Sequence, residues 1–216
     1  MNKLLEDISS ALQSGKTKAV RELVTTAIDE GVPPGEILHD GLMAGMDVVA
    51  IKFKDGDVFV PEVLMSARAM SAGTLLLKPH LTDSQAAQVG KAVIGTVKGD
   101  LHDIGKNLVK MMFEGKGIEV VDLGADVAPE RFVEAAKAEN ADIIAMSALL
   151  TTTMGEMKNT VDLLVEEGIR KQVTVMVGGA PITDSFRKEI GADIYTDDAA
   201  SAASAARDVI AARQTK

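Results

Sequence analysis

Two residues near the middle of the chain have types and a spacing that suit metal chemistry. His102 follows Asp100 by two positions, shortly after an apolar segment of strand character. A carboxylate at that distance can accept the imidazole N–H, fix the tautomer and raise the basicity of the other ring nitrogen. A histidine held in this way is prepared to ligate a metal, although a lone histidine is more often a structural residue.

The other two histidines do not extend this arrangement. His39 and His80 lie in the N-terminal part of the chain, and neither has a carboxylate two positions away. The sequence contains no cysteine, so thiolate ligands are excluded together with disulfides and iron–sulfur clusters. A metal at His102 would therefore take most of its ligands from elsewhere, for instance from a macrocycle.

The loop around His102 also invites a comparison with nucleotide-binding loops. Residues 98–106 contain Gly99 and Gly105 and lead into a predicted helix, whose N-terminus favours phosphate. However, Leu101 stands where the dinucleotide motif requires its second glycine, and no G-x-x-x-x-G-K-[ST] motif is present. Because Leu101 is bulky and Asp100 is anionic, a dinucleotide site is not expected.

The elements that position this loop are predicted from alternating apolar segments beyond residue 90. Strands are expected at 92–97, 118–122, 143–147, 173–177 and 193–195, and helices at 104–114, 129–138, 154–167, 182–190 and 199–212. Nearly continuous apolar strands that alternate with helices are typical of a doubly wound five-stranded parallel sheet of Rossmann-like type. Ligands bind such sheets beyond the carboxyl ends of the strands, where the loop of His102 lies.

The first 80 residues predict a different architecture. Helices are expected from Leu4 to the turn at Gly15 and over 18–30, 34–53 and 61–78, which together form a four-helix bundle. Phe53 and Val60 flank a turn at Gly56, where they either complete the core or cover something large and flat. The polar stretch near residue 80 predicts a domain boundary, with a helical cap at 1–80, a linker at 81–90 and an α/β domain at 91–216.

Composition excludes several classes of function. The 216 residues carry a net charge of −9, which argues against nucleic acid as a partner because phosphate contacts need clustered Lys and Arg. No run of 18 apolar residues and no signal-peptide segment is present, so a cytoplasmic protein without membrane contact is expected.

Three motifs then give the sequence a resemblance to a known family. Asp100-x-His102-x-x-Gly105 is followed after 42 positions by Ser147-x-Leu149, and after a further 29 by Gly178-Gly179. This series resembles the D-x-H-x-x-G, S-x-L and G-G signature of cobalamin-binding domains. With the helical segment included, the chain resembles the stand-alone corrinoid proteins of methyltransferase systems, which are related to the cap and cobalamin-binding module of methionine synthase.

The resemblance implies roles for individual residues. His102 would be the lower axial ligand of cobalt in a cobalamin or related corrinoid (His-on), with Asp100 bonded to it and Thr153 standing where relatives often carry a serine. The displaced nucleotide tail would lie in a slot, and the corrin ring would be covered by the cap. The implied slot residues are Ser147, Leu149, Thr151, Gly178 and Gly179. Asp103, Ile104 and Gly105 would also bind the cofactor, and Phe53 and Val60 would shield its upper face.

The resemblance also implies the function of a methyl carrier. Cob(I)alamin would accept a methyl group from a substrate-specific methyltransferase subunit, and the methyl-Co(III) form would pass it to a methylcorrinoid:acceptor methyltransferase that serves tetrahydrofolate or a thiol. The sequence shows no second catalytic constellation, so the chain is expected to be a corrinoid subunit rather than a complete enzyme. A separate reductive activator is expected because Co(I) oxidises easily. Methylamines, betaine, methanol and aryl methyl ethers all remain open as donors.

Two other classes of protein fit these residues less well. A cobalamin-dependent sensor or regulator would need an output module, and the N-terminal segment has no basic recognition helix. A receiver-like signalling domain would use an acidic strand end as its phosphoacceptor, but it leaves His102, Ser147 and the Gly178-Gly179 pair without a role.

Overall fold

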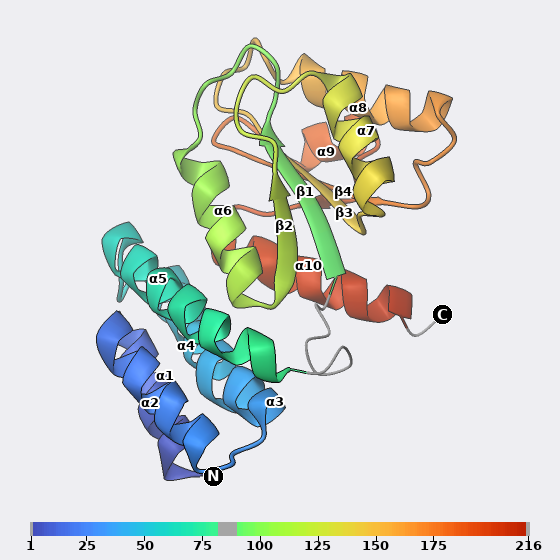
Figure 1. Ribbon diagram of the computed structural model, residues 1–216. Coiled ribbons are helices and arrows are strands. Elements are labelled where there is room, and N and C mark those ends of the chain that lie inside the picture. Colours follow the sequence, from blue (N-terminus) through green and yellow to red (C-terminus); the bar gives the residue numbers. More distant parts are fainter. Residues whose placement is uncertain (1, 82–89, 215–216) are drawn as a thin grey trace. The chain divides into compact units, whose positions relative to one another are not determined.

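The computed structural model of the protein describes residues 2–81 and 90–214 (Figure 1). Its contacts divide the chain into an N-terminal helical unit and a C-terminal α/β unit. The predicted linker at 81–90 lies almost wholly outside the described residues. In the part of the chain that is described, every helix falls short of the length and apolar character that a membrane crossing requires.

The helical unit contains the helices α1, Lys3–Gln13; α2, Thr17–Asp29; α3, Pro34–Glu36; the π-helical η1, Ile37–Met43; α4, Ala44–Asp55; α5, Val60–Leu77; and the short 3-10 segment η2, Lys78–His80. α1 begins at an Asn2 side chain that accepts from the Leu4 N–H, and α5 begins where Glu62 accepts from the Phe59 N–H at 2.6 Å. Apolar side chains that recur at helical spacing fill its core, among them Ile8, Leu12, Val20, Val24, Leu42, Val49, Val63 and Met70.

The third predicted helix differs from the prediction in its interior. Residues 34–55 are helical throughout, but Ile37–Met43 has π-helical hydrogen bonding rather than α-helical. In this segment α1 approaches closely, since a Cβ on Gly41 would lie 3.2 Å from Cγ2 of Ile8. The apolar stripe predicted one regular helix because it reports which face is buried, not which carbonyl each N–H selects.

The α/β unit confirms the predicted doubly wound sheet. Five parallel strands lie in the order β2-β1-β3-β4-β5. The strands are β1, Gly90–Thr96; β2, Ile118–Asp122; β3, Ile143–Ser147; β4, Thr174–Gly178; and β5, Ile194–Tyr195. The helices are α6, Ile104–Gly115; α7, Pro129–Glu139; α8, Gly155–Glu166; α9, Asp184–Ile190; and α10, Ala199–Gln214.

Within this unit, α7, α8 and α9 lie on one side of the sheet, and α6 and α10 lie on the other (Figure 1). Phe132 of α7 and Leu164 of α8 are buried against Val93 and Ile144 of the central strands. At the carboxyl ends of the strands, Thr96 pairs with Ser147, which pairs with Gly178. The chain order reverses between β1 and β3, and ligands of doubly wound sheets bind at such a reversal.

Candidate functional site

The carboxylate of Asp100 is the centre of the site at this reversal. Asp100 is completely buried in the loop that follows β1, and both of its oxygens accept hydrogen bonds. Oδ1 accepts from the backbone N–H of His102 at 3.0 Å and lies 2.8 Å from Nδ1 of the His102 ring. Oδ2 accepts from the N–H groups of Leu149 and Leu150 at 2.7 and 3.1 Å, and from Oγ1 of Thr153 at 3.0 Å. One carboxylate therefore connects the loops that follow β1 and β3.

These hydrogen bonds decide the charge of Asp100. Burial raises the pKa of the carboxyl group, but the hydrogen bonds from His102, Leu149 and Leu150 outweigh it and hold the pKa well below its usual range. An ionised carboxylate can only accept, so the proton between the two side chains belongs to Nδ1 of His102. In the neutral ring with its proton on Nδ1, Nε2 carries the lone pair that a metal ligand requires.

The His102 ring is accessible, and several large apolar side chains of the same two loops are exposed. Its side chain is 52% exposed although its partner Asp100 is buried. Leu101 and Ile104 beside it are 75% and 78% exposed, and Leu149 and Leu150 of the neighbouring loop are also exposed. A group of exposed large apolar side chains around one imidazole marks a surface that binds something large.

Two glycines at this edge differ in what a side chain would meet. A Cβ on Gly179, whose φ is +126°, would lie 1.9 Å from the carbonyl oxygen of Ala148, so the backbone itself requires glycine there. A Cβ on Gly105, in the first turn of α6, would meet no heavy atom within 4 Å. The packing of the described residues therefore does not require glycine at 105.

The structure brings some of the predicted site residues together and leaves others apart. Asp100, His102, Leu149 and Thr153 are connected by hydrogen bonds, and Ser147 and Gly178 are neighbours in the sheet. Thr151 is exposed in the loop after β3. The exposed Asp103 accepts from the side chain of Asn107 at 3.0 Å and so stabilises the first turn of α6. Phe53 and Val60 are half-buried in the helical unit.

Three residues that support this loop were not singled out from the sequence. Thr96 donates from Oγ1 to the carbonyl oxygen of His102 at 3.0 Å, and Asp126 accepts from the N–H of Gly99 at 2.7 Å. Lys106, only 2% exposed, reaches Oδ1 of Asp122 at 2.6 Å and joins α6 to the end of β2. Burial raises the pKa of Asp122, but the hydrogen bonds from Lys106 and Gly124 outweigh burial and hold the pKa below its ordinary value. No local sequence signal distinguishes these residues, since each contact joins separate segments.

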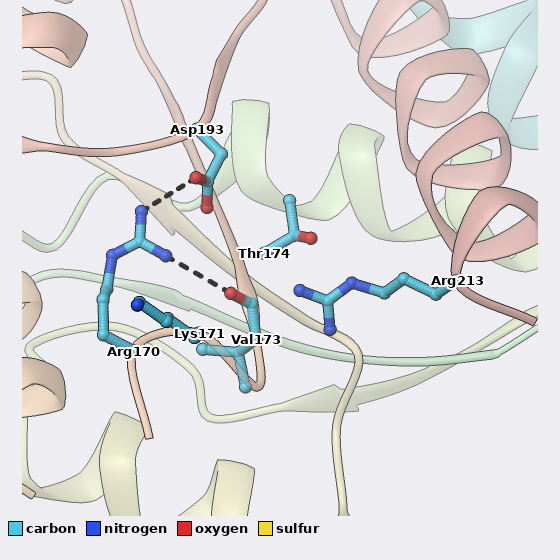
Figure 2. A pocket seen from close by; sticks show the side chains of 6 residues that line it. All are labelled: Arg170, Lys171, Val173, Thr174, Asp193 and Arg213. Carbon is cyan, nitrogen blue, oxygen red and sulfur yellow. Dashed lines mark hydrogen bonds and ion pairs between the residues drawn. The ribbon is translucent and has the colours of Figure 1, made fainter. Parts of the chain in front are cut away.

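A hollow lies at the amino end of β4, at the end of the sheet opposite to His102 (Figure 2). It is lined by Arg170, Lys171, Val173, Thr174, Asp193 and Arg213. Arg170 forms an ion pair with Asp193 at 2.9 Å and donates to the carbonyl oxygen of Val173, and Arg213 donates to the carbonyl oxygen of Gln172. Its two arginines thus have partners within the fold, at the edge away from His102.

Among the described residues, no three His, Cys, Asp or Glu side chains come together as a metal cage. The donor set at His102 is a single imidazole with a carboxylate behind it. Such a set suits a metal whose remaining ligands belong to its own cofactor, as in haem proteins.

Comparison with known proteins places this geometry in context. A family model described as a B12 binding domain matches residues 90–206, and a second model with the same description matches residues 4–78. Dimethylamine corrinoid protein 3 of Methanosarcina acetivorans is 44% identical over 207 residues, which are 96% of this chain and 97% of that protein.

Two solved structures are similar over almost the whole chain. A chain in the crystal structure of the methanol:cobalamin methyltransferase complex from Methanosarcina barkeri has a TM-score of 0.88 and 34% identity, covering 97% of this chain and 80% of that one. A cobalamin-binding protein from Desulfitobacterium hafniense has a TM-score of 0.81 and 31% identity, covering 95% and 98%.

Proposed function

We propose, from the premise that this chain belongs to the B12-binding family of corrinoid proteins found in methyltransferase systems, that it carries methyl groups on a corrinoid ligated by His102. The observation that carries the proposal is the accessible imidazole of His102, whose Nδ1 is held 2.8 Å from the buried carboxylate of Asp100 at the reversal of the sheet.

The residues at this edge fit a corrinoid. The single imidazole of His102 could ligate the cobalt of a corrinoid, whose remaining ligands would belong to the cofactor itself. The exposed side chains of Leu101, Ile104 and Leu150 provide apolar surface for a large flat ring. Gly105 has space in front of it that protein packing does not use. These features support a cobalamin or related corrinoid as the cofactor.

When bound, the corrinoid supplies a cobalt nucleophile that accepts and releases the methyl group. The protein's own residues would adjust the reactivity of the cobalt through the His102 ligand. Nε2 of His102 would provide the axial ligand, and ionised Asp100 would hold the Nδ1 proton and so strengthen the donor. Thr153 would complete the relay, although its single hydroxyl proton is shared between Asp100 Oδ2 at 3.0 Å and the carbonyl oxygen of Leu150 at 2.9 Å.

The nucleotide tail of the cofactor would lie between the ends of β3 and β4. Ser147 and Gly178 are register neighbours there, and Gly179 lets the chain pass within contact of Ala148. Small residues at the ends of these two strands would make room for a planar base. The proposed tail residues are Ser147, Leu149, Thr151, Gly178 and Gly179, with Asp103, Ile104 and Gly105 on the side of α6.

The helical unit would cover the reactive face of the cofactor. Phe53 near the end of α4 and Val60 at the start of α5 flank the turn at Gly56 and are the proposed shielding residues. In this proposal, residues 1–80 form the cap that covers the cofactor, residues 81–90 form the linker, and residues 91–216 form the α/β domain that binds it. The cap would have to move aside for methyl transfer, because a partner must reach the cobalt.

The proposed partners are two methyltransferases and an activator. A substrate-specific methyltransferase would load the methyl group, and a methylcorrinoid:acceptor methyltransferase would pass it to tetrahydrofolate or a thiol. A separate reductive activator would restore the reduced cofactor after oxidation. Relatives named for dimethylamine and for methanol are both similar to this chain, so the likeness supports the carrier role without selecting one donor.

The carrier role is tested by methylation with and without a partner. The reduced, corrinoid-loaded protein is mixed with methylamines, betaine, methanol and an aryl methyl ether, alone and with the methyltransferase encoded beside it. We expect the absorption change that accompanies methylation only when the partner is present. Rapid methylation by one of these donors without any partner would show that the chain is itself the complete enzyme.

His102 ligation is tested separately by electron paramagnetic resonance of the loaded protein in the Co(II) state. The histidines are labelled with ¹⁵N, so that the His102 nitrogen is distinguished from the ¹⁴N of the cofactor's own base. We expect hyperfine structure from one ¹⁵N nucleus in the native protein and its loss in His102→Ala. An unchanged nitrogen coupling in His102→Ala would contradict the ligand assignment.

A further inference from the structure

Two side chains outside the signature motifs hold the backbone of the loop that carries Asp100 and His102. Thr96, the last residue of β1, donates to the carbonyl oxygen of His102, and Asp126, between β2 and α7, accepts from the N–H of Gly99. The first contact lies after the motif's aspartate and the second lies before it. Together they hold the loop from two sides.

Thr96 is completely buried, and its position is fixed by the sheet. Its N–H donates to the carbonyl oxygen of Gly124 at 2.9 Å, and its carbonyl oxygen accepts from the N–H of Val127 at 3.0 Å. A buried hydroxyl needs a partner, and here the partner is the His102 carbonyl at 3.0 Å. Because Asp100 accepts the N–H of the same residue, the peptide groups on both sides of His102 are held. The backbone of His102, from which the imidazole side chain extends, is thereby fixed.

Asp126 adopts a backbone conformation that is unfavourable for most residues. Its φ is +55°, in the left-handed region, where aspartate and asparagine are tolerated better than other side chains. Its carboxylate accepts the Gly99 N–H at 2.7 Å, and its own N–H donates to the carbonyl oxygen of Asp100 at 3.0 Å. This reciprocal pair fastens the loop after β1 to the loop after β2. Strain of this kind persists where surrounding contacts require it.

We propose that Thr96 and Asp126 are positioning residues, which hold His102 and Asp100 in the geometry that axial ligation needs. The proposal rests on the proposed function, since it concerns the same imidazole. Neither residue would contact the cofactor itself. Their removal therefore lowers the share of protein with His102 bound to the metal, while contacts of the nucleotide tail keep the corrinoid in place.

The test for Thr96 uses a nearly isosteric pair of variants in the full chain loaded with cobalamin and reduced to Co(II). Thr96→Val keeps the shape and removes the donor, whereas Thr96→Ser keeps the donor. With ¹⁵N-labelled histidines, paramagnetic resonance gives the ratio of protein whose cobalt is bound to a histidine nitrogen to protein whose cobalt is not, and absorbance gives the cobalamin retained. Loss of one hydrogen bond predicts a fall of about three- to tenfold in that ratio for Thr96→Val. Thr96→Ser should keep the native ratio, with cobalamin retained in both.

The test for Asp126 separates the side-chain acceptor from the backbone conformation. Asp126→Gly accepts the positive φ without strain but removes the oxygen that binds Gly99, and Asp126→Asn keeps both features. We expect a similar fall in the ratio for the glycine variant and the native ratio for the asparagine variant. In the cofactor-free protein, the NMR resonances of the His102 ring nitrogens should be broadened or doubled in Thr96→Val and Asp126→Gly only, because the ring then samples more than one environment.

The outcomes separate this proposal from the function on which it rests. Native protein without coupling to a histidine nitrogen would overturn His102 ligation and the positioning roles with it. Native coupling with an unchanged ratio in both Thr96→Val and Asp126→Gly would overturn the positioning roles alone. An equal fall in Thr96→Ser and Thr96→Val would show that the hydroxyl is not the cause, and would overturn the role of Thr96.

Discussion

At the scale of single residues, the site depends on the fact that Asp100 is only an acceptor. Five donors, three of them backbone N–H groups, converge on its two oxygens in a place that water does not reach. The carboxylate thus has two tasks. It sets the protonation of the His102 ring, and it connects segments that are 49 to 53 positions apart in the chain.

Asp100→Asn should therefore destabilise the protein even without cofactor. An amide offers one acceptor oxygen and places an NH₂ group against donors, so at least one buried N–H loses its partner. We expect the free energy of unfolding to fall by about 1–3 kcal/mol, measured by urea denaturation. The control is Asp103→Asn, a change in an exposed carboxylate of the same loop, which should cost much less. Equal losses in the two variants would contradict the special role of Asp100.

The Asp100 carboxylate also predicts how the free energy of unfolding depends on pH, with a definite sign. An unfolded aspartate has a pKa near 3.9, and hydrogen bonding holds the pKa of Asp100 below this value in the folded state, against the effect of burial. The unfolded chain then binds the proton more tightly, so the stabilisation by Asp100 is complete above about pH 5 and is lost as the pH falls toward the folded pKa. The stability difference between native protein and Asp100→Asn should shrink between pH 5 and pH 3. A constant difference over that range would argue against this account.

Spacing alone predicted that Asp100 and His102 interact, because the two residues are only two positions apart in the sequence. Thr153 lies 53 positions from Asp100, and only the resemblance to a family suggested that the two meet. Thr96 and Asp126 gave no signal at all. Threonine at the end of an apolar strand and aspartate in a turn are both common. Their role here depends on contacts between loops that only folding brings together.

At the scale of elements, strands were predicted to within two residues of where they lie, because buried parallel strands are short apolar runs between polar loops. Helix starts were predicted equally closely, but the interior of one helix was not. The π-helical η1 was expected to be α-helical, and α9 begins two residues later than expected because Thr183 caps it, accepting from the N–H of Phe186 at 3.2 Å.

The junction of α6 with β2 depends on the ion pair between Lys106 and Asp122. Lys106→Met keeps the length of the side chain but leaves the Asp122 carboxylate with Lys110, whose Nζ is 3.3 Å away. Loss of a hydrogen bond to a charged group predicts a fall of about 1.5–3 kcal/mol in the free energy of unfolding. Lys110→Met is the control, because that contact is longer and more exposed. A loss in Lys110→Met as large as that in Lys106→Met would show that the buried pair has no special role.

The two glycines predict opposite outcomes for the same substitution. Gly179→Ala should destabilise the cofactor-free protein, by about 1–3 kcal/mol from its positive φ alone, and further because of the clash with Ala148. Gly105→Ala should leave that stability unchanged or slightly higher, since alanine is favoured in a helix and finds open space. If Gly105 faces the corrinoid, Gly105→Ala will nevertheless weaken cobalamin binding, measured by titration of the apoprotein. Unchanged binding would remove Gly105 from the site.

At the scale of the whole molecule, the chain combines one candidate reactive centre with a net charge of −9. A carrier that visits two enzymes in turn needs interfaces that release quickly, and charged interfaces serve this because they speed encounter and respond to salt. Both units match B12-binding models, which indicates that the helical unit belongs to the function and is not an unrelated addition.

The proposed cover is tested at Phe53. Phe53→Ala should speed the oxidation and photolysis of the bound cofactor, because it loosens the cover over the reactive face. Phe59→Ala is the matched control, since Phe59 belongs to the same connection but is 67% exposed. Decay rates are followed by absorbance under light and under air. Unchanged rates in Phe53→Ala would return Phe53 to a purely structural role in the helical unit.

The bridge formed by Asp100 has a consequence for the timescale on which its partners meet solvent. The side chains of Leu149 and Leu150 are exposed, as in a segment whose backbone opens easily. Their N–H groups, however, donate to a buried ionised oxygen, and deuterium can replace those protons only when the bridge opens. These two amides should therefore exchange as slowly as those of the neighbouring strands, and should lose that protection together in Asp100→Asn. A loop that is open at its surface would then be among the slowest parts of the protein to exchange.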